Sequence, residues 1–498
     1  MNPDAPKTLS GGQLLLGGLL LAAANFLVVL DTTIANVSVP NIAGGLAVSS
    51  SQGTFVITSY AVAEAVTVPL TGWLAARFGA VRTFVLGMLG FGLCSALCGF
   101  AQSLGMLVLF RVMQGLAGGP LMPLSQTLLL RIFPKEKAPA AMGIWAMTTL
   151  VAPILGPILG GTLCDSWGWP FIFFINVPIA IVCAAACWGL LRPFETPLVK
   201  SRIDIVGLLL LIVWVGALQI MLDEGKDLDW FASTDIVGLA IVAAIGFAAF
   251  LIWESTVDHP IVDLRVFRHR GYAMAVLTIS LGFGAFFGTA VLTPLWLQSN
   301  MGYTATWAGY ATAVSGVSAV LLAPLVAKLS AKVDPRPLVF FGLAWMAGVT
   351  FYRCGSTSDM TYFQIAAPLL LQGIGMPFFF VPLTSLALAS VDPVETASAA
   401  GLMNFLRTFS GAFATSLVNT LWEDGATRNR AELVDMLRPD VLSGGLSAGR
   451  LDQLVQGQGV MLATNQVFLG VAAALFLASL VIWLAPRPTR VADTTGVH

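Results

Sequence analysis

Fourteen apolar stretches follow one another along the chain and constrain its fold more than any other feature. A stretch of about 20 apolar residues crosses the hydrocarbon core of a bilayer as a single helix. The pattern therefore predicts an all-α polytopic membrane protein with 14 transmembrane helices. The predicted spans are 13–37, 52–73, 83–101, 104–126, 139–162, 170–191, 204–222, 234–254, 271–297, 304–328, 337–353, 362–388, 397–420 and 464–485.

Composition excludes two other classes of protein. Hydrophobic residues make up 57% of the chain and charged residues 10%, whereas soluble domains contain about 45–50% apolar and about 25% charged residues. The formal net charge of −1 gives no electrostatic attraction to nucleic acid. We therefore expect the chain to be surrounded by a lipid bilayer and to bind no nucleic acid.

Basic residues predict the orientation of the chain in the membrane, because cytoplasmic loops carry an excess of Lys and Arg. An even number of spans places both termini on one side. The tails and short loops on that side carry 17 of these residues, against two, Lys226 and Arg353, in the short loops of the other side. Both termini are therefore expected in the cytoplasm.

The polar segment 421–463 is predicted to lie on the outer side. Its stretch ATRNRAELVDMLR, which begins at Ala426, has the pattern of an amphipathic helix. The segment either contacts a partner protein or is a solvated loop, and the sequence leaves both interpretations open.

Two sequence matches with the same offset of eight spans indicate an internal duplication. The stretch VPLTGWLAARFG begins at Val68 in span 2, and APLVAKLSAKVD begins at Ala323 in span 10. The Gln-Gly pair at 114–115 in span 4 recurs at 372–373 in span 12. Secondary transporters are commonly built from such repeats, with the substrate site near the midplane between them.

The duplication predicts three parts. Residues 1–191 form an N-terminal six-helix bundle, and residues 192–270 form a linker with two extra transmembrane helices. Residues 271–498 form the C-terminal six-helix bundle, which includes the outer loop 421–463 and a cytoplasmic tail.

Two acidic residues, Asp31 and Glu64, lie well inside predicted spans, where a charge is costly and is a functional hypothesis by default. At a rise of 1.5 Å per residue, Asp31 lies roughly 9 Å from the outer end of span 1, and Arg111 lies roughly 10 Å from the outer end of span 4. The two side chains are expected to meet at one level. Protonation of Asp31 would leave Arg111 uncompensated, which couples a proton to helix packing; a static ion pair is the alternative.

Glu64 and Arg407 have no oppositely charged residue close to them in the sequence. Glu64 is expected to carry a proton or to bind cationic substrates, or else to stay protonated and hydrogen-bonded. Arg407 is expected to bind a substrate anion or Glu64 across a central cavity, or else helix-end carbonyls.

Span 5 contains prolines and glycines in the stretch APILGPILGG. Prolines within a helix bend it, and small residues four apart allow a neighbouring helix to approach closely. The predicted hinge residues are Pro153, Gly156, Pro157, Gly160 and Gly161.

Polar residues inside other spans are candidates for contacts with a substrate. They are Asn25, Asn36, Gln114, Gln126, Gln298 and Asn404, together with Arg407.

Enzyme chemistry is not indicated. No HExxH, nucleophile-elbow or paired-carboxylate pattern lies in or beside the spans, and no Walker A sequence is present. The three histidines, His259, His269 and His498, do not form a metal site on their own. We expect neither cofactor nor metal, and a proton gradient as the energy source.

These motifs together resemble the major facilitator superfamily, in its 14-span drug:proton antiporter branch. The stretches that carry the resemblance are LDTTIANVSVP at 30–40, GWLAARFG at 72–79, RVMQG at 111–115, WAMTTLVAPILGPILGG at 145–161, FFINVP at 173–178, YTATWAG at 303–309 and NFLRTFSG at 404–411. The similarity extends over roughly 13–485 and is strongest to the Emr-type inner-membrane subunits of tripartite multidrug pumps.

The resemblance implies proton-driven export of hydrophobic, drug-like compounds across the bacterial inner membrane, and antibiotic resistance. In the family, the residues that match Asp31 and Arg111 serve proton coupling, and the glycine-proline motif of span 5 marks antiporters. The resemblance also implies a periplasmic adaptor (membrane fusion protein) and an outer-membrane channel as partners. An exporter dedicated to one endogenous metabolite, lipid or siderophore is the alternative.

The loop after span 2 normally gates between states in this family. Its matching residues here are Gly72, Arg77, Gly79 and Arg82, but the usual acidic residue is replaced by Ala76. We therefore expect Arg77 and Arg82 to act on other helix ends in place of the charge latch that is usual in this loop.

Overall fold

The computed structural model describes residues 9, 11–48, 50–134, 137–199, 203–226, 228–258, 260–436 and 448–487, and these contain helices and no strand. The helices of the first half are α1 (Gly11–Gly45), α2 (Ser50–Gly53), α3 (Phe55–Thr67), α4 (Thr71–Phe78), α5 (Ala80–Gly99), α6 (Leu104–Gly118), α7 (Leu121–Ile132), α8 (Ala138–Trp167), α9 (Phe171–Phe174) and α10 (Asn176–Leu191). Those that follow are α11 (Ile205–Glu224), α12 (Thr234–Thr256), α13 (Arg270–Ser299), α14 (Ala305–Ser330), α15 (Pro335–Tyr352), α16 (Tyr362–Ala389), α17 (Thr396–Asp435) and α19 (Ala448–Val481). Short 3₁₀ turns lie at Arg192–Phe194, Trp230–Ala232, Leu264–Arg268, Arg353–Gly355 and Ile482–Leu484.

Eleven helical segments of the described residues are long and apolar enough to cross a membrane, and the bent pair α3–α4 makes a twelfth if it counts as one span. This pair bends by 60°, and Pro69 lies in the break, where its ring cannot donate a backbone hydrogen bond. The helices α8 and α17, of 30 and 40 residues, match two further predicted spans. The total of 14 spans stays a prediction.

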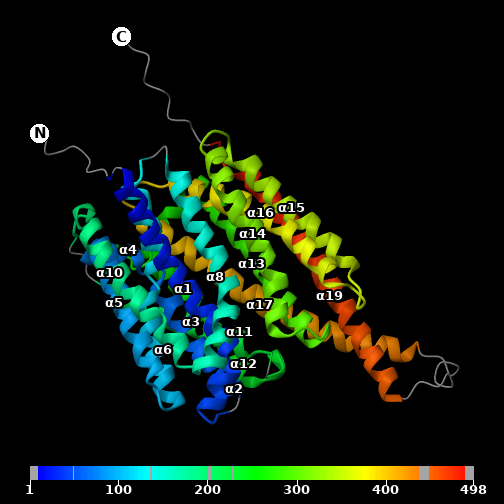
Figure 1. The fold of residues 1–498 in the computed structure, drawn as a ribbon. Helices are drawn as coiled ribbons and strands as arrows, with labels where there is room; N and C mark the ends of the chain where they lie inside the picture. Colours follow the sequence, from blue (N-terminus) through cyan, green and yellow to red (C-terminus); the bar gives the residue numbers. More distant parts are fainter. Residues whose placement is uncertain are drawn as a thin grey trace, which may run out of the picture.

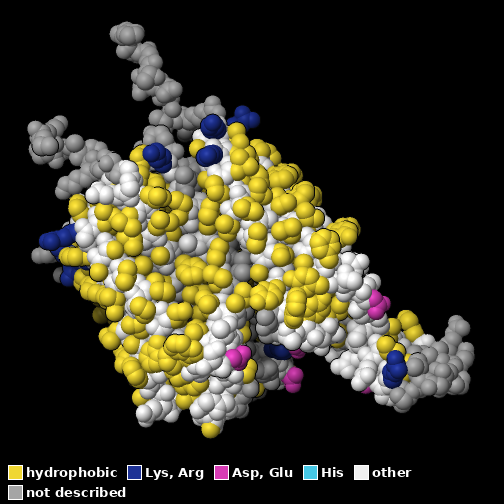
Figure 2. Space-filling model, viewed as in Figure 1, with side chains coloured by type: hydrophobic (Ala, Val, Ile, Leu, Met, Phe, Trp, Pro, Cys, Tyr) yellow, Lys and Arg dark blue, Asp and Glu magenta, His cyan; other side chains and the backbone are white. Residues whose placement is uncertain are grey.

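The chain forms two groups of helices that lie side by side (Figure 1). We call the end that holds the start of α1 and the turn Ile482–Leu484 the proximal end, and the opposite end the distal end. The N-terminal group packs against the C-terminal group through α8 on α14 and through α4 and α7 on α17. Most of the apolar side chains on the visible face cover the middle of the molecule, and dark blue Lys and Arg side chains gather at its proximal end (Figure 2).

The helices α11 and α12 pack on each other and connect the two groups. Helix α11 contacts α3 on one side and α17 on the other. The ring of Trp214 lies 5.9 Å from that of Phe405 on α17 and 5.9 Å from that of Phe250 on α12. At the distal end, Lys226 forms a 2.6 Å ion pair with Glu423. Helices α11 and α12 are therefore anchored to both groups.

The segment 421–463 differs from the predicted loop with one amphipathic helix. Helix α17 continues to Asp435, and α19 begins at Ala448, so the described parts of the segment extend two long helices that project at the distal end (Figure 1). Polar contacts between the two helices stabilise this hairpin, since Trp422 Nε1 donates to Thr464 at 2.9 Å and Arg430 pairs with Asp452 at 2.6 Å. The drop in hydropathy after residue 420 therefore marks the end of the apolar part of α17 and not the end of the helix.

Candidate functional site

A buried ion pair between Asp31 on α1 and Arg111 on α6 is the centre of a polar cluster in the N-terminal group. Arg111 Nη1 lies 2.6 Å from Asp31 Oδ2, and both side chains are 1% exposed. The other carboxylate oxygen of Asp31 accepts from Gln114 Nε2 at 3.1 Å and from Asn176 Nδ2 at 2.6 Å. Asp31 thus receives donors from α6 and α10, which is how a buried carboxylate offsets its loss of water.

Arg111 is also held by neutral groups. Its Nε donates to the Val56 carbonyl at 3.1 Å, and Nη1 donates to Gln114 Oε1 at 2.9 Å. The guanidinium lies over the ring of Tyr60, 4.2 Å from its centroid. Loss of the negative charge on Asp31 would leave this cation buried without a counter-ion, which is costly.

Sequence reasoning missed three members of the cluster, Asn176, Ser95 and Tyr60. Asn176 donates to Ser95 Oγ at 3.0 Å, and Ser95 donates to the Phe173 carbonyl at 2.9 Å. The signal for Asn176 was a lone amide in the apolar stretch FFINVP. Ser95 and Tyr60 had no comparable signal, because a single hydroxyl is common in membrane helices.

The glycines of α8 lie against α1, the helix that carries Asp31. A Cβ atom on Gly156 would lie 2.6 Å from the Cβ of Thr33, and one on Gly160 would lie 3.3 Å from the Ile34 carbonyl oxygen. A Cβ on Gly161 would meet nothing within 4 Å. Two of the three predicted glycines thus allow α1 and α8 to approach closely. Helix α8 is unbroken over 138–167, and the side chains of Pro153 and Pro157 lie outside the described residues.

A second polar group lies between the two halves of the molecule. Asn404 Nδ2 on α17 donates to Gln126 Oε1 on α7 at 2.6 Å. Arg407, one turn further along α17, is 2% exposed, and its Nη2 lies 2.7 Å from Met122 Sδ. Its Nε and Nη1 have no hydrogen-bond partner among the described residues. The rings of Trp145 and Phe283 lie 5.5 and 5.3 Å from the guanidinium carbon.

Arg407 is therefore a buried cation that lacks a counter-ion within 4.0 Å in the described part of the chain. Aromatic faces stabilise a guanidinium by about 0.5–2 kcal/mol each, which does not replace two missing hydrogen bonds. Glu64 is close enough to interact with it electrostatically, but its side chain forms no hydrogen bond or ion pair that the structure describes. An anionic group between the halves would satisfy Arg407.

The remaining residues that were predicted to contact a substrate do not lie together. Asn25 is buried and donates to Thr148 and Thr149 on α8, each at 2.8 Å. Asn36 is exposed, and Gln298 is exposed near the distal end of α13, where it donates to the Pro294 carbonyl of its own helix at 3.2 Å. The structure thus brings Gln126, Asn404 and Arg407 together and does not bring Asn36 or Gln298 to them.

The predicted gating loop forms the proximal contact between the halves. A Cβ on Gly72 would lie 2.9 Å from the Cα of Ser398 on α17. Gly79 has φ +94°, and a Cβ there would overlap the Glu195 carboxylate, so a side chain is excluded on both grounds.

Arg82 and Arg77 behave differently from each other. The carboxylate of Glu195 accepts from the backbone N–H of Val81 at 2.9 Å and of Arg82 at 3.0 Å, and Arg82 Nε lies 3.9 Å from it. The Glu195 carboxylate thus caps the N-terminus of α5. Arg82 lies beside this cap on its own helix and does not reach the C-terminal half of the molecule. Arg77 is exposed and forms no ion pair with a described residue. Sequence reasoning missed Glu195, which lies just beyond span 6.

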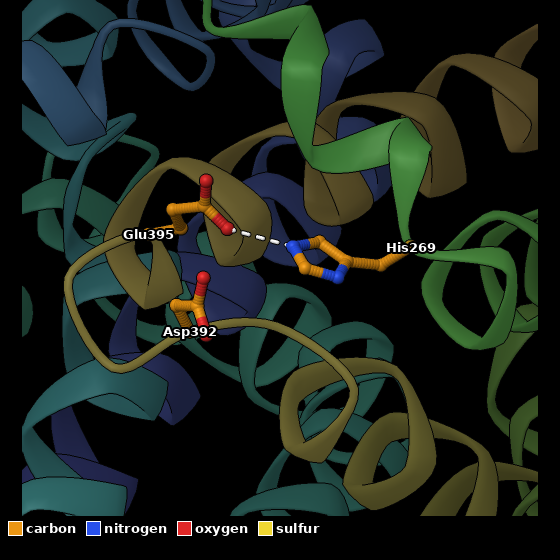
Figure 3. Close-up of side chains that lie close together, drawn as sticks. All are labelled: His269, Asp392 and Glu395. Atoms are coloured by element: carbon orange, nitrogen blue, oxygen red, sulfur yellow. Dashed lines mark hydrogen bonds and ion pairs between the residues drawn. The ribbon is translucent and has the colours of Figure 1, made fainter.

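His269, Asp392 and Glu395 meet at the proximal end, between the start of α13 and the loop before α17 (Figure 3). One ligand atom of each lies within 4.8 Å of the others, and His269 Nε2 is 2.9 Å from Glu395 Oε2. Histidine and carboxylates are metal-binding groups. The prediction from the sequence considered a metal site formed by the histidines alone and therefore did not include Asp392 and Glu395. However, Arg268 Nη2 lies 2.7 Å from Glu395 and 3.5 Å from Asp392. Since the arginine already binds both carboxylates, we assign the group as an ion-pair cluster.

Comparison with known families decides the class of this protein. The profile of the Major Facilitator Superfamily matches residues 21–415. The chain belongs to this superfamily. It is 43% identical to the multidrug export protein EmrB of Escherichia coli (strain K12), with 97% of each chain covered. It is 42% identical to the fatty acid resistance protein FarB of Neisseria gonorrhoeae, over 96% of this chain and 97% of FarB.

Solved structures of the superfamily share the fold at low sequence identity. The proton:xylose symporter XylE superposes with a TM-score of 0.62 at 13% identity, over 95% of this chain and 96% of XylE. The human organic anion transporter MFSD10 superposes with a TM-score of 0.59 at 13% identity, over 95% of this chain and 100% of MFSD10. The protein is thus a multi-pass membrane transporter of the major facilitator fold, similar to multidrug exporters.

Proposed function

We propose that this transporter exports hydrophobic, drug-like compounds in exchange for protons, by alternating access across the bacterial inner membrane. The observation that carries the proposal is the buried cluster of Asp31 and Arg111, built on the helix that packs against the glycine face of α8. Similarity to EmrB supports drug export. No covalent chemistry is needed, and the proton gradient supplies the energy.

Proton binding to Asp31 is the proposed coupling step. Neutralising the carboxylate removes the charge from its bonds to Arg111, Gln114 and Asn176, and charge-assisted bonds are roughly twice as strong as neutral ones. Helix α1 can then shift relative to α6 and α10. Helix α1 lies against Gly156 and Gly160 of α8, and α8 packs on α14. A shift of α1 would therefore move α8, and through α8 it would move α14 in the C-terminal half.

The substrate site is proposed to lie between the halves, where Gln126, Asn404 and Arg407 meet Trp145 and Phe283. Aromatic faces suit hydrophobic substrates, and Glu64 is proposed as a second titrating or cation-binding group. The proximal contact of Gly72 with Ser398 closes one side of this site. If the termini are cytoplasmic, as the loop charges predict, this is the state closed to the cytoplasm.

We further propose 14 spans, with α8 and α17 completing the set and α11 and α12 as the inserted pair between the bundles 1–191 and 271–498. The distal hairpin of α17 and α19 is then periplasmic. Similarity to EmrB and EmrY supports assembly with a periplasmic adaptor and an outer-membrane channel, and we propose the hairpin as the surface that contacts the adaptor.

An exporter dedicated to one endogenous lipid-like acid is the second candidate. Two observations favour it, namely the guanidinium of Arg407, whose Nε and Nη1 have no partner among the described residues, and the similarity to FarB, a fatty acid resistance protein. It differs from the first candidate in substrate range and not in mechanism.

Drug-driven proton movement in everted vesicles tests the proposal. We expect lipophilic drugs to dissipate the proton gradient in the wild type but not in Asp31→Asn. The matched control is Asp235→Asn, the same change at an exposed position of α12, which should behave as wild type. Absence of drug-driven flux in the wild type would overturn the multidrug proposal, and full activity of Asp31→Asn would make Asp31 a structural residue.

A further inference from the structure

The ring of Tyr60 on α3 is the closer of two aromatic rings that face the Arg111 guanidinium. Its centroid lies 4.2 Å from the guanidinium carbon, and that of Phe173 on α9 lies 5.6 Å from it. Tyr60 is 1% exposed, and its hydroxyl has no hydrogen-bond partner among the described residues. The contact with Arg111 is therefore made by the ring of Tyr60 and not by its hydroxyl.

The packing of α3 on α6 fixes the ring in this place. A Cβ on Gly115 would lie 2.6 Å from the Tyr60 carbonyl oxygen and 2.9 Å from the Cβ of Ala63, so glycine lets the two backbones approach closely. Arg111 lies one turn before Gly115 on α6. Because this backbone contact does not involve Asp31, it is independent of the charge on the carboxylate.

Arg353 in the C-terminal group shows how this chain buries an arginine without a carboxylate. Its Nη1 donates to Gln372 Oε1 at 3.2 Å, and its Nη2 donates to Thr293 Oγ1 at 2.8 Å. The centroid of the Phe468 ring lies 4.2 Å from its guanidinium carbon. Arg353 is buried and forms no ion pair with a carboxylate in the part of the chain that the structure describes. Neutral acceptors and one aromatic face therefore hold a buried guanidinium in this fold.

Arg111 has the same kinds of partner once Asp31 is set aside. Its neutral acceptors are a backbone carbonyl and Gln114 Oε1, and the ring of Tyr60 lies at the same 4.2 Å. Gln114 and Gln372 are also the matched glutamines of the internal duplication. The C-terminal site thus resembles the N-terminal site in the state in which Asp31 is protonated.

We infer that Tyr60 is a positioning residue for proton coupling, whose ring stabilises Arg111 while Asp31 holds a proton and thereby sets the pH at which Asp31 is protonated. The inference rests on the proposed role of Asp31. A cation is attracted to an aromatic face by its charge, and this attraction is weaker when a carboxylate neutralises the cation. The ring therefore favours the protonated state of Asp31 over the charged one.

Other titratable groups also face this site. Glu64 on α3 and Cys98 on α5 are close enough to interact electrostatically with Arg111. Among the other helices that pack on α1, α7 and α8 carry one charged residue each, Arg131 and Asp165, near the ends of these helices, and α2, α9 and α10 carry none. A test must therefore follow the protonation of Asp31 itself and not the total uptake of protons.

Infrared difference spectroscopy of the full-length protein in lipid, titrated over pH, tests the inference. The carboxyl band that is absent in Asp31→Asn reports protonation of Asp31. We expect Tyr60→Leu to lower the midpoint of this band by about one pH unit, since a desolvated cation–π contact changes an equilibrium constant by about tenfold. Phe173→Leu should lower the midpoint by less, because its ring lies farther away. Tyr60→Phe keeps the ring and should titrate as the wild type does.

Phe84→Leu is the matched control for loss of a buried ring. Phe84 on α5 is fully buried and is not one of the rings that face Arg111, so this variant should lose stability without a shift of the midpoint. Thermal unfolding shows whether each variant is folded, and Phe173→Leu decides the question if Tyr60→Leu does not fold.

An unchanged midpoint in the folded leucine variants of Tyr60 and Phe173 would overturn the inference. Equal shifts in Tyr60→Phe and Tyr60→Leu would do the same, as would a wild-type carboxyl band that does not respond to pH. Because the titration is measured without drug or transport, it is separate from the vesicle assay. Unchanged midpoints beside normal Asp31-dependent drug transport would reject this inference alone, whereas absence of drug-driven proton movement in the wild type would reject the proposed function.

Discussion

At the residue scale, substitutions of Asp31 and Arg111 are expected to change the free energy of unfolding and the proton coupling in different ways. Each of Asp31→Asn and Arg111→Gln leaves one partner of a buried pair alone, which costs about 3–5 kcal/mol. The double variant removes both charges, so its loss should be clearly smaller than the sum of the two single losses. Drug-driven proton movement should be absent in all three variants. Thermal unfolding in detergent and the vesicle assay measure the two effects separately.

The outcome distinguishes a coupling pair from a static one. If the double variant transports like the wild type, the pair only stabilises the fold and proton coupling must lie elsewhere, with Glu64 as the next residue to test. If the two stability losses simply add, the side chains do not interact in solution as they do in the structure.

Sequence reasoning placed Asp31 and Arg111 at one depth because helical rise converts residue counts into distance. It did not find Asn176 or Glu195, because nothing local in the sequence says which loop or helix will lie beside a buried charge. The same limit applies to the candidates that the structure leaves apart. Asn36 and Gln298 are polar residues within apolar runs, and a run alone does not say which face of its helix meets the other half.

At the element scale, the contact of α1 with α8 is expected to tolerate no added atom at Gly156. Gly156→Ala and Gly161→Ala make the same chemical change in one helix, but a Cβ at 156 lies 2.6 Å from Thr33 Cβ whereas one at 161 meets nothing within 4 Å. Overpacking costs about 1–3 kcal/mol, so Gly156→Ala should lower drug transport by about tenfold, and Gly161→Ala should stay near wild type.

Transport rates at matched expression in vesicles check this expectation. Equal loss in both variants would mean that the glycines act through helix flexibility and not through the α1 contact.

The periodicity of small residues in α8 predicted the close approach of a neighbouring helix, but only the structure identified that neighbour as α1. Hydropathy predicted a span over 397–420, whereas helix α17 continues to Asp435, because the polar hairpin beyond Leu421 is stabilised by contacts such as Trp422 with Thr464.

At the scale of the whole molecule, transport requires the proximal contact between the halves to open. Gly72 and Ser398 face each other there, and a Cβ built on Gly72 lies 2.9 Å from the Cβ of Ser398, slightly closer than the 3.5–4.5 Å of a disulfide. In a background without the native cysteines, the pair Gly72→Cys/Ser398→Cys should form a disulfide under oxidising conditions. That bond holds the halves together, so drug-driven proton movement should stop and return on reduction. The single variants in the same background should show no dependence on oxidation, and continued transport by the fully cross-linked protein would mean that this contact does not open during the cycle.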